Sequence, residues 1–160
     1  MASTALERFT ARAAERGIDA EVRTFPEGTR TAADAAAAIG CDVAQIVKSL
    51  VFQADGEPVL VLTSGANRVD EAALADVVGA QTIKKANAAQ VREATGYAIG
   101  GTPPFGHDTS LAVVCDTDLA EQEQVWAAAG TPIAVFPLTG AQLVAASGAT
   151  VAAVAAARSG

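Results

Sequence analysis

The chain has few of the residues that build metal sites and disulfides. Its 160 residues include one histidine, His107, and two cysteines, Cys41 and Cys115. The cysteines lie far apart and form no CxxC pair, so we expect neither a zinc site nor a disulfide framework. Cys115, inside the run LAVVCD, is expected to be a small buried apolar residue. We therefore expect no metal and no cofactor.

Long apolar runs and a signal peptide are also missing. Hydrophobic residues make up 51 % of the chain, many of them alanine, and no run reaches the ~18 uninterrupted apolar residues of a membrane span. The N-terminus alternates charged and apolar residues at helical spacing and lacks the apolar core and cleavage site of a signal peptide. We expect a cytoplasmic protein of one domain with no membrane partner.

Positive charge is scarce. The chain has 11 lysines and arginines against 18 acidic residues, a net charge of -7. Binding of long nucleic acid through its phosphates requires clustered lysine and arginine, so DNA is not an expected partner. Any nucleic acid must be held locally, and the cations available for this are Lys48, Arg68, Lys84, Lys85 and Arg92.

The chain interleaves strand-like and helix-like segments. Residues 45–65 hold two β-rich runs joined by Asp55-Gly56, which predicts a β-hairpin. Further strands are predicted at 20–28, 80–86, 110–116 and 131–138, and helices at 3–16 (capped by Ser3), 31–40, 69–79, 87–96, 119–130 and 139–148, before a tail of small residues. Because the hairpin is antiparallel, we predict an α/β fold with a twisted, mixed sheet surrounded by helices, rather than a doubly wound parallel sheet.

Lys48 lies in the middle of the apolar run QIVKSLVF. Strand alternation places it on the same face as Leu50 and Phe52. One interpretation is an edge strand whose lysine reaches water. Because both faces of the strand are apolar, we favour a lysine that lines a pocket and meets an anion or a carbonyl group. Ser49 points to the opposite face, which argues against a Ser-Lys nucleophilic pair.

The segment GGTPPFGH, residues 100–107, combines adaptable glycines with stiff prolines. Gly100 and Gly101 let the backbone approach a ligand closely, and Pro103 and Pro104 restrict the residues that follow. A loop that presents main-chain groups to a ligand and a tight structural connection fit this pattern equally well. The segment matches neither the P-loop nor the dinucleotide-binding fingerprint.

The order of these features resembles a known family. The chain carries, in order, the lysine strand IVKSLVF, the glycine turn TSGANRVD, the segment KKANAAQVREATGYAIGGTPPFGH and the strand LAVVCD. This order is similar to the YbaK/aminoacyl-tRNA synthetase-associated domain family, relatives of the editing insertion of bacterial prolyl-tRNA synthetase. The resemblance spans about residues 21–155, and it implies one YbaK-like domain over 1–160 with an N-terminal helix at 3–16.

The resemblance implies a trans-editing deacylase, which hydrolyses the ester between a mischarged small amino acid and the 3′ end of tRNA. Such a protein has no nucleophile of its own and relies on water or on a thiol or hydroxyl of the substrate. The implied partners are the acceptor end of aminoacyl-tRNA and an aminoacyl-tRNA synthetase. The alternatives are a non-catalytic module that binds a tRNA end or a synthetase, and an unrelated small-molecule hydrolase, for which no nucleophile or metal constellation is visible.

The resemblance also assigns roles to residues. Lys48 matches the family's signature lysine, which is implied to hold the 3′ end, and Gly100 and Gly101 bring the backbone to the amino-acid pocket. These three are the predicted catalytic residues. The predicted substrate-binding residues are Asn67, Thr102, Pro103, Pro104, Phe105, His107 and Asp116. From the residues alone, Asn67 is interpreted as a helix cap, Asp116 either points into a site or starts the following turn, and His107 is a structural or surface residue. With the resemblance, His107 is interpreted as a pocket-wall or positioning residue rather than a general base.

Overall fold

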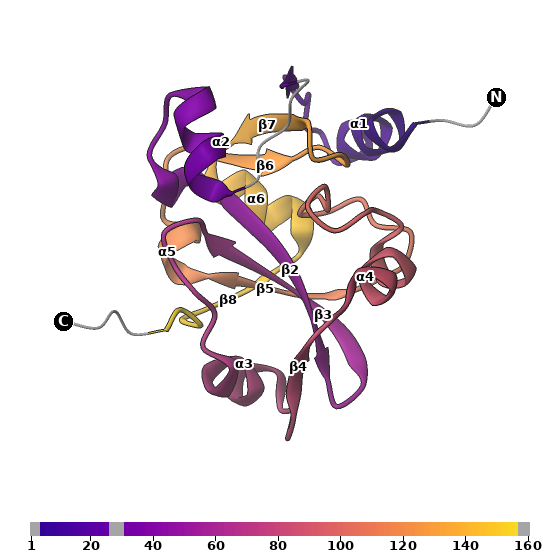
Figure 1. Cartoon of the computed structure of the whole chain (residues 1–160), viewed down its shortest axis with the longest axis vertical. Helices are drawn as coiled ribbons and strands as arrows, with labels where there is room; N and C mark the ends of the chain where they lie inside the picture. The colour runs from indigo at the N-terminus through magenta and orange to yellow at the C-terminus, as the bar shows by residue number, and fades with distance from the viewer. Residues whose placement is uncertain (1–3, 26–30, 157–160) are drawn as a thin grey trace.

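Two β-sheets form the frame of the protein (Figure 1). The structure is a computed structural model that describes residues 4–25 and 31–156. The first sheet has the strand order β4 (Ile83–Lys85), β2 (Val47–Ala54), β3 (Glu57–Ser64), β5 (Ala112–Asp116) and β8 (Thr150–Ala152). The second has the order β1 (Arg23–Thr24), β7 (Ala134–Leu138) and β6 (Val125–Ala128). The helices are α1 (Ala5–Glu15), α2 (Ala32–Ile39), α3 (Glu71–Val78), α4 (Ala88–Thr95), α5 (Thr117–Ala120) and α6 (Gly140–Ser147), with a 3-10 turn η1 (Val43–Gln45).

The five-stranded sheet is mixed, as predicted. β4, β2 and β3 pair antiparallel, whereas β3, β5 and β8 pair parallel. The hairpin between β2 and β3 turns at Asp55 and Gly56, whose φ angles of 49° and 86° are both positive. Positive φ at both central residues is the type I′ geometry, whose twist matches that of the flanking strands. The Asp-Gly pair therefore fixes the register of the longest strand pair.

The helices begin and end where their capping residues predict. The side chain of Asp70 accepts hydrogen bonds at the start of α3, and that of Asn87 does so at the start of α4. Gly40, Gly79 and Gly96 end α2, α3 and α4 in the left-handed conformation. Helix α1 starts from Thr4, whose side chain accepts from the Glu7 amide, while the predicted cap Ser3 lies outside the described residues, as do Pro26 and Gly28.

The core is layered. Odd-numbered residues of β2 and even-numbered residues of β3 pack between the two sheets with α1 and α6, around Phe9, Leu60 and Phe136. The other face of the large sheet is covered by α3 through Leu74. Helix α2 covers the outer face of the small sheet over Trp126. Strand β2 is therefore covered on both faces, which is the environment that its sequence indicates.

Two predictions about the second half of the chain are wrong. The helix predicted over 119–130 contains only the end of the short α5, and residues 125–128 form β6, paired antiparallel with β7. An alanine-rich apolar run fits a buried strand as well as a helix, and pairing with β7 decides between them because it buries Val125 and Ala127 against the core. The small-residue tail also contains a strand, β8, which extends the large sheet beside β5.

Candidate functional site

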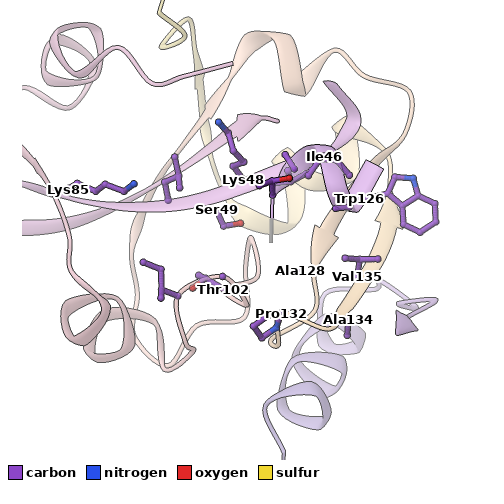
Figure 2. A pocket seen from close by; sticks show the side chains of 17 residues that line it. Ile46, Lys48, Ser49, Lys85, Thr102, Trp126, Ala128, Pro132, Ala134 and Val135 are labelled. Atoms are coloured by element: carbon purple, nitrogen blue, oxygen red, sulfur yellow. The ribbon is translucent and has the colours of Figure 1, made fainter. Parts of the chain in front are cut away.

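A cavity of about 420 Å³ opens beside β2, where that strand is not paired with β4. Its wall comes from β2, the loop after α4, the small sheet and α2, and it includes Lys48, Ser49, Gly100, Thr102 and Trp126 (Figure 2). Most of the other lining residues are apolar, and none of the described ones is acidic. The cavity therefore offers an apolar space with a positively charged rim. It brings together Lys48, Gly100 and Thr102 among the residues singled out from the sequence.

Lys48 is, with Lys85, one of the two charged residues among the described residues that line this cavity. It is half-buried, and its Nζ donates a hydrogen bond of 2.5 Å to the carbonyl oxygen of Asn67, in the turn before α3. Burial lowers the pKa of Lys48, and the positive charges of Lys85 and Arg68 lower the pKa further. A partly desolvated ammonium group among other cations gains most from an anionic or strongly polar ligand.

Ser49 and Lys48 leave β2 on opposite sides. Figure 2 shows Ser49 directed toward Thr102 and Lys48 directed away from it. The Ser49 hydroxyl oxygen is buried and has no hydrogen-bond partner among the described residues. A Ser-Lys nucleophilic pair is therefore excluded by the strand geometry, as the alternation of the sequence indicates.

The loop 100–107 carries its glycines for two different reasons. Gly100 has φ of +88° and lies at the cavity wall, where a side chain would be strained by the backbone conformation. Gly101 packs against the β6–β7 connection, and a Cβ there would lie 2.7 Å from Thr131 Cα. Its amide donates to the Ala98 carbonyl. Gly100 is thus the glycine on the cavity wall, and Gly101 holds the loop against the small sheet.

Substituting Gly101 with alanine is expected to displace this loop. Because the added Cβ would overlap Thr131 backbone atoms, we expect the free energy of unfolding to fall by about 1–3 kcal/mol. We also expect the activity at the cavity to fall about 10²-fold, since displacing a catalytic group by about 1 Å can cost that much. Gly79→Ala is the control for lost stability alone, because the φ of +71° at Gly79 strains any side chain, while a Cβ there meets nothing within 4 Å and the residue does not line the cavity. A Gly101→Ala variant as active as Gly79→Ala would contradict the role of this packing.

A brace from helix α1, which the sequence did not indicate, holds the far end of the loop. Arg12 Nη1 donates to the Gly106 carbonyl at 2.8 Å and to Asp108 Oδ1 at 2.7 Å, and Tyr97 donates to the same carbonyl at 2.9 Å. The carboxylate of Asp108 raises the pKa of Arg12. Arg12 lies on a predicted amphipathic helix where a charged residue is unremarkable, so no local signal identifies it as a loop contact.

His107 takes part in this brace. Its Nε2 lies 2.7 Å from the carbonyl oxygen of Pro103, and its ring meets Tyr97 edge-on. A carbonyl oxygen only accepts, so Nε2 carries the hydrogen. Burial lowers the pKa of His107, which favours the neutral ring near pH 7. His107 does not line the cavity beside Lys48. Its observed contacts are those of a residue that fixes the loop.

Asn67 and Asp116 meet in a buried polar cluster next to the cavity. Asn67 Nδ2 donates to Asp118 Oδ2 at 2.9 Å and lies 3.4 Å from Asp116 Oδ2. Asp116 caps α5 and accepts from the Val154 and Ala155 amides. The cluster connects the turn before α3, which receives the Lys48 hydrogen bond, to the end of β5. Asp116 therefore has the capping role that its sequence context allows, whereas Asn67 does not cap α3, which is capped by Asp70, and instead links the turn before α3 to Asp118.

The remaining residues of the loop are buried rather than exposed to the cavity. Pro103, Pro104 and Phe105 are all buried and are not among the cavity-lining residues. The Phe105 ring lies 5.3 Å from that of Phe9 and 6.0 Å from that of Phe136, centroid to centroid. The structure therefore places the apolar half of GGTPPFGH in the core between the two sheets, where it anchors the glycine half at the cavity.

Within residues 4–25 and 31–156, no three histidine, cysteine or acidic side chains gather as metal ligands. Both cysteines are free thiols, and burial raises the pKa of Cys115 to about 12, as for an inert core residue. No helix in these ranges is both long and apolar enough to cross a membrane.

Comparison with known proteins identifies the family. Residues 26–146 match the family described as aminoacyl-tRNA editing domain. Proline--tRNA ligase of Nitratidesulfovibrio vulgaris (strain DP4) is 36 % identical over 100 residues, which are 62 % of this chain but only 17 % of the ligase. The uncharacterized protein YwhH of Bacillus subtilis is 30 % identical over 124 residues, 77 % of this chain and 78 % of YwhH.

A solved structure matches over nearly the whole chain. It is described as a candidate trans-editing enzyme for prolyl tRNA synthetase, it is 42 % identical, and the alignment has a TM-score of 0.91 over 98 % of this chain and 100 % of that one. The sequence match therefore extends to the arrangement of both sheets. The chain belongs to the aminoacyl-tRNA editing domain family.

Proposed function

We propose that this protein is a trans-editing aminoacyl-tRNA deacylase that removes a mischarged small amino acid from the 3′ end of tRNA. The observation that carries the proposal is the cavity that is lined by both Lys48, from β2, and Gly100, from the loop after α4. Family membership and the nearly full-length match to a candidate trans-editing enzyme support the same reaction. We extend the proposal to one editing domain over residues 1–160, acting in the cytoplasm.

The reaction needs little from the protein beyond orientation and charge. Water attacks the ester carbonyl carbon, the bond to the ribose oxygen breaks, and the products are a free amino acid and tRNA with its hydroxyl restored. In our proposal Lys48 binds the terminal nucleotide with N–H donors that its bond to Asn67 leaves available. Gly100 allows the backbone to approach the ester, so that catalysis comes from positioning and preorganised dipoles.

The cavity wall also accounts for selection by size. Alanine side chains at positions 32, 35, 128 and 134, together with Trp126 and Val135, leave an apolar space with few polar groups. Such a pocket distinguishes ligands mainly by volume, and one methylene is worth about 1–3 kcal/mol, or roughly 10–200-fold. In our proposal this wall favours a small side chain on the ester over the larger cognate amino acid.

A deacylation panel tests this proposal. Purified protein is incubated with tRNA for proline charged with alanine, cysteine, serine or threonine, and release of the amino acid is followed beside prolyl-tRNA. We expect at least one mischarged substrate to be hydrolysed roughly 10-fold or more faster than prolyl-tRNA. A second candidate function, a non-catalytic module that binds a tRNA end or a synthetase, is favoured by the same cavity if the charged RNAs bind and none is turned over.

The partners follow from the proposed reaction. We propose the acceptor end of aminoacyl-tRNA as the substrate partner and a prolyl-tRNA synthetase as a protein partner, since relatives of this domain occur within proline--tRNA ligases. With a net charge of -7, the chain does not attract a whole tRNA through its overall field. Local gripping of the acceptor end then has to supply the contact.

A further inference from the structure

The three lysines of the chain gather at one edge of the large sheet. Lys48 lies on β2, and Lys84 and Lys85 lie on the edge strand β4. In the pairing register, Lys85 is opposite Phe52, so its side chain leaves the sheet on the same face as that of Lys48. Figure 2 shows both residues along the same side of the cavity region. The positive charge of Lys85 contributes to the lowered pKa of Lys48.

Lys85 joins two cavities. It lines the cavity of Lys48 and also a second one, of about 360 Å³, lined further by Gln53, Gly56, Thr82, Lys84 and Gln90. These other lining residues are polar or glycine, in contrast to the apolar first cavity. None of the described residues that line either cavity is acidic. The neighbouring Asp55 carboxylate lines neither cavity; it accepts from the Gln81 and Thr82 amides at 2.8–3.1 Å and from the Thr82 hydroxyl at 3.0 Å.

Lysines on an edge strand commonly discourage pairing with other sheets. That role requires only exposed charges, and it does not account for a polar cavity beside them that continues into the candidate active site. In a chain of net charge -7, two neighbouring cavities that have no acidic residue among their described lining residues and that together collect every lysine are a local exception. The side-chain amides of Gln53 and Gln90, beside the lysines, are donors that phosphodiester oxygens bind.

We propose that Lys84 and Lys85 bind the phosphodiester groups that precede the terminal nucleotide. The single-stranded 3′ end then runs from the first cavity, which holds the aminoacyl ester near Lys48, over Lys85 into the cavity of Lys84, Gln53 and Gln90. This inference rests on the proposed deacylase function, because it assigns a path to the substrate of that site. It sets the direction in which the acceptor end leaves the protein, along β4 and toward the N-terminus of α4.

The test compares a substrate that contains phosphodiester groups with one that has the same aminoacyl ester but no phosphate. Wild type and Lys84→Gln/Lys85→Gln are assayed on the best mischarged tRNA of the panel and on the same aminoacyl ester of adenosine, which has no phosphate. We expect the double variant to lower the ratio of kcat/KM for tRNA to kcat/KM for the adenosine ester about 10-fold, mainly through KM for tRNA, since exposed ion pairs each contribute modestly. Equal losses on both substrates, or no loss on tRNA, would overturn the proposal.

Binding of uncharged RNA gives a readout that does not depend on turnover. The probe is a short single strand ending in CCA, followed by fluorescence anisotropy over a range of salt concentrations. We expect the slope of log affinity against log salt to become shallower by about 1.4 in the double variant, or about 0.7 for each lost phosphate contact. An unchanged slope would overturn the proposed phosphate binding by Lys84 and Lys85, even if the protein deacylates tRNA. A shallower slope supports this phosphate binding even if no ester is hydrolysed, in which case only the proposed deacylase function fails.

Arg92→Gln is the matched control. It removes one positive charge from an exposed position of α4, close in sequence to Gln90, but Arg92 lines neither cavity. We expect its salt slope and its ratio of tRNA to adenosine-ester hydrolysis to stay at the wild-type values. If Arg92→Gln had an effect as large as that of the double variant, the net charge of the protein, rather than phosphate binding by Lys84 and Lys85 on β4, would attract the RNA. This result would overturn the proposal.

Discussion

Lys48→Ala is expected to lower kcat/KM for deacylation about 10²–10³-fold, the range observed when one preorganised donor is removed from an active site. Lys48 is a charged donor at the cavity wall. Its ammonium group contacts the turn at Asn67 and lies close enough to Lys85 for the charge of Lys85 to lower the pKa of Lys48. No other cation of β2 can replace it, since Lys48 is the only charged residue of that strand. Lys48→Arg is expected to recover only part of the activity, because a planar guanidinium does not reproduce a compact ammonium group.

The fold is expected to tolerate loss of this charge, which separates a functional from a structural effect. Lys48→Met keeps the aliphatic stem. The lost hydrogen bond from the ammonium group to Asn67 contributes about 1.5–3 kcal/mol, and this loss is partly offset because the variant no longer has to desolvate a charged group. Because burial lowers the pKa of Lys48 below 10.5, the unfolded chain retains a proton that the native state has released between the two pKa values. Wild-type stability relative to Lys48→Met should therefore rise with pH through this window and level off above about pH 10.5.

Urea denaturation of both proteins from neutral to alkaline pH, together with single-turnover deacylation, measures these effects. Arg92→Met serves as a charge-removing control at an exposed position. If Lys48→Ala retains full deacylation, the anchoring role of Lys48 is wrong. If Lys48→Met unfolds several kcal/mol more easily than wild type, the lysine is instead a structural residue and its loss of activity follows from the damaged fold.

The local parts of this fold could be predicted because they are encoded in adjacent residues. Asp55-Gly56 determines the hairpin, and Asp70 and Asn87 determine where α3 and α4 begin. The alternation of β2 predicts that Lys48 and Ser49 leave the strand on opposite sides, which the structure shows. Each of these features depends on backbone conformations and hydrogen bonds within a few residues, where sequence patterns are most informative.

The parts that could not be predicted depend on residues distant in the sequence. Whether 125–128 is a strand depends on its pairing with β7 and on the burial of Trp126 under α2. The brace at Gly106 requires Arg12, which lies 94 positions earlier. In the loop 100–107, composition indicates stiffness, but it does not indicate which residues face the cavity. Tertiary packing divides the loop into a cavity-facing part at Gly100 and a core-facing part at Phe105.

Phe105→Ala is expected to be the most destabilising single substitution in this loop. The side chain is 2 % exposed and its ring packs between those of Phe9 and Phe136, with the Arg16 guanidinium 5.8 Å from its centroid. Removing a buried phenylalanine costs about 3–5 kcal/mol because it leaves a cavity that neighbours only partly fill. For a chain of this size, the melting temperature should fall by roughly 6–20 °C, measured by calorimetry or circular dichroism.

Phe105→Leu distinguishes a core residue from a wall of the amino-acid pocket. A leucine keeps most of the buried volume, so we expect a cost below about 1.5 kcal/mol and an unchanged preference among mischarged amino acids at temperatures where the variant is folded. A shift in that preference, without loss of stability, would instead support the substrate-binding role that the family resemblance implies for Phe105. The first result would mean that selectivity resides in the wall formed by β2, β6 and β7, and that the bulk of the Phe105 side chain serves to hold Gly100 in place beside that wall.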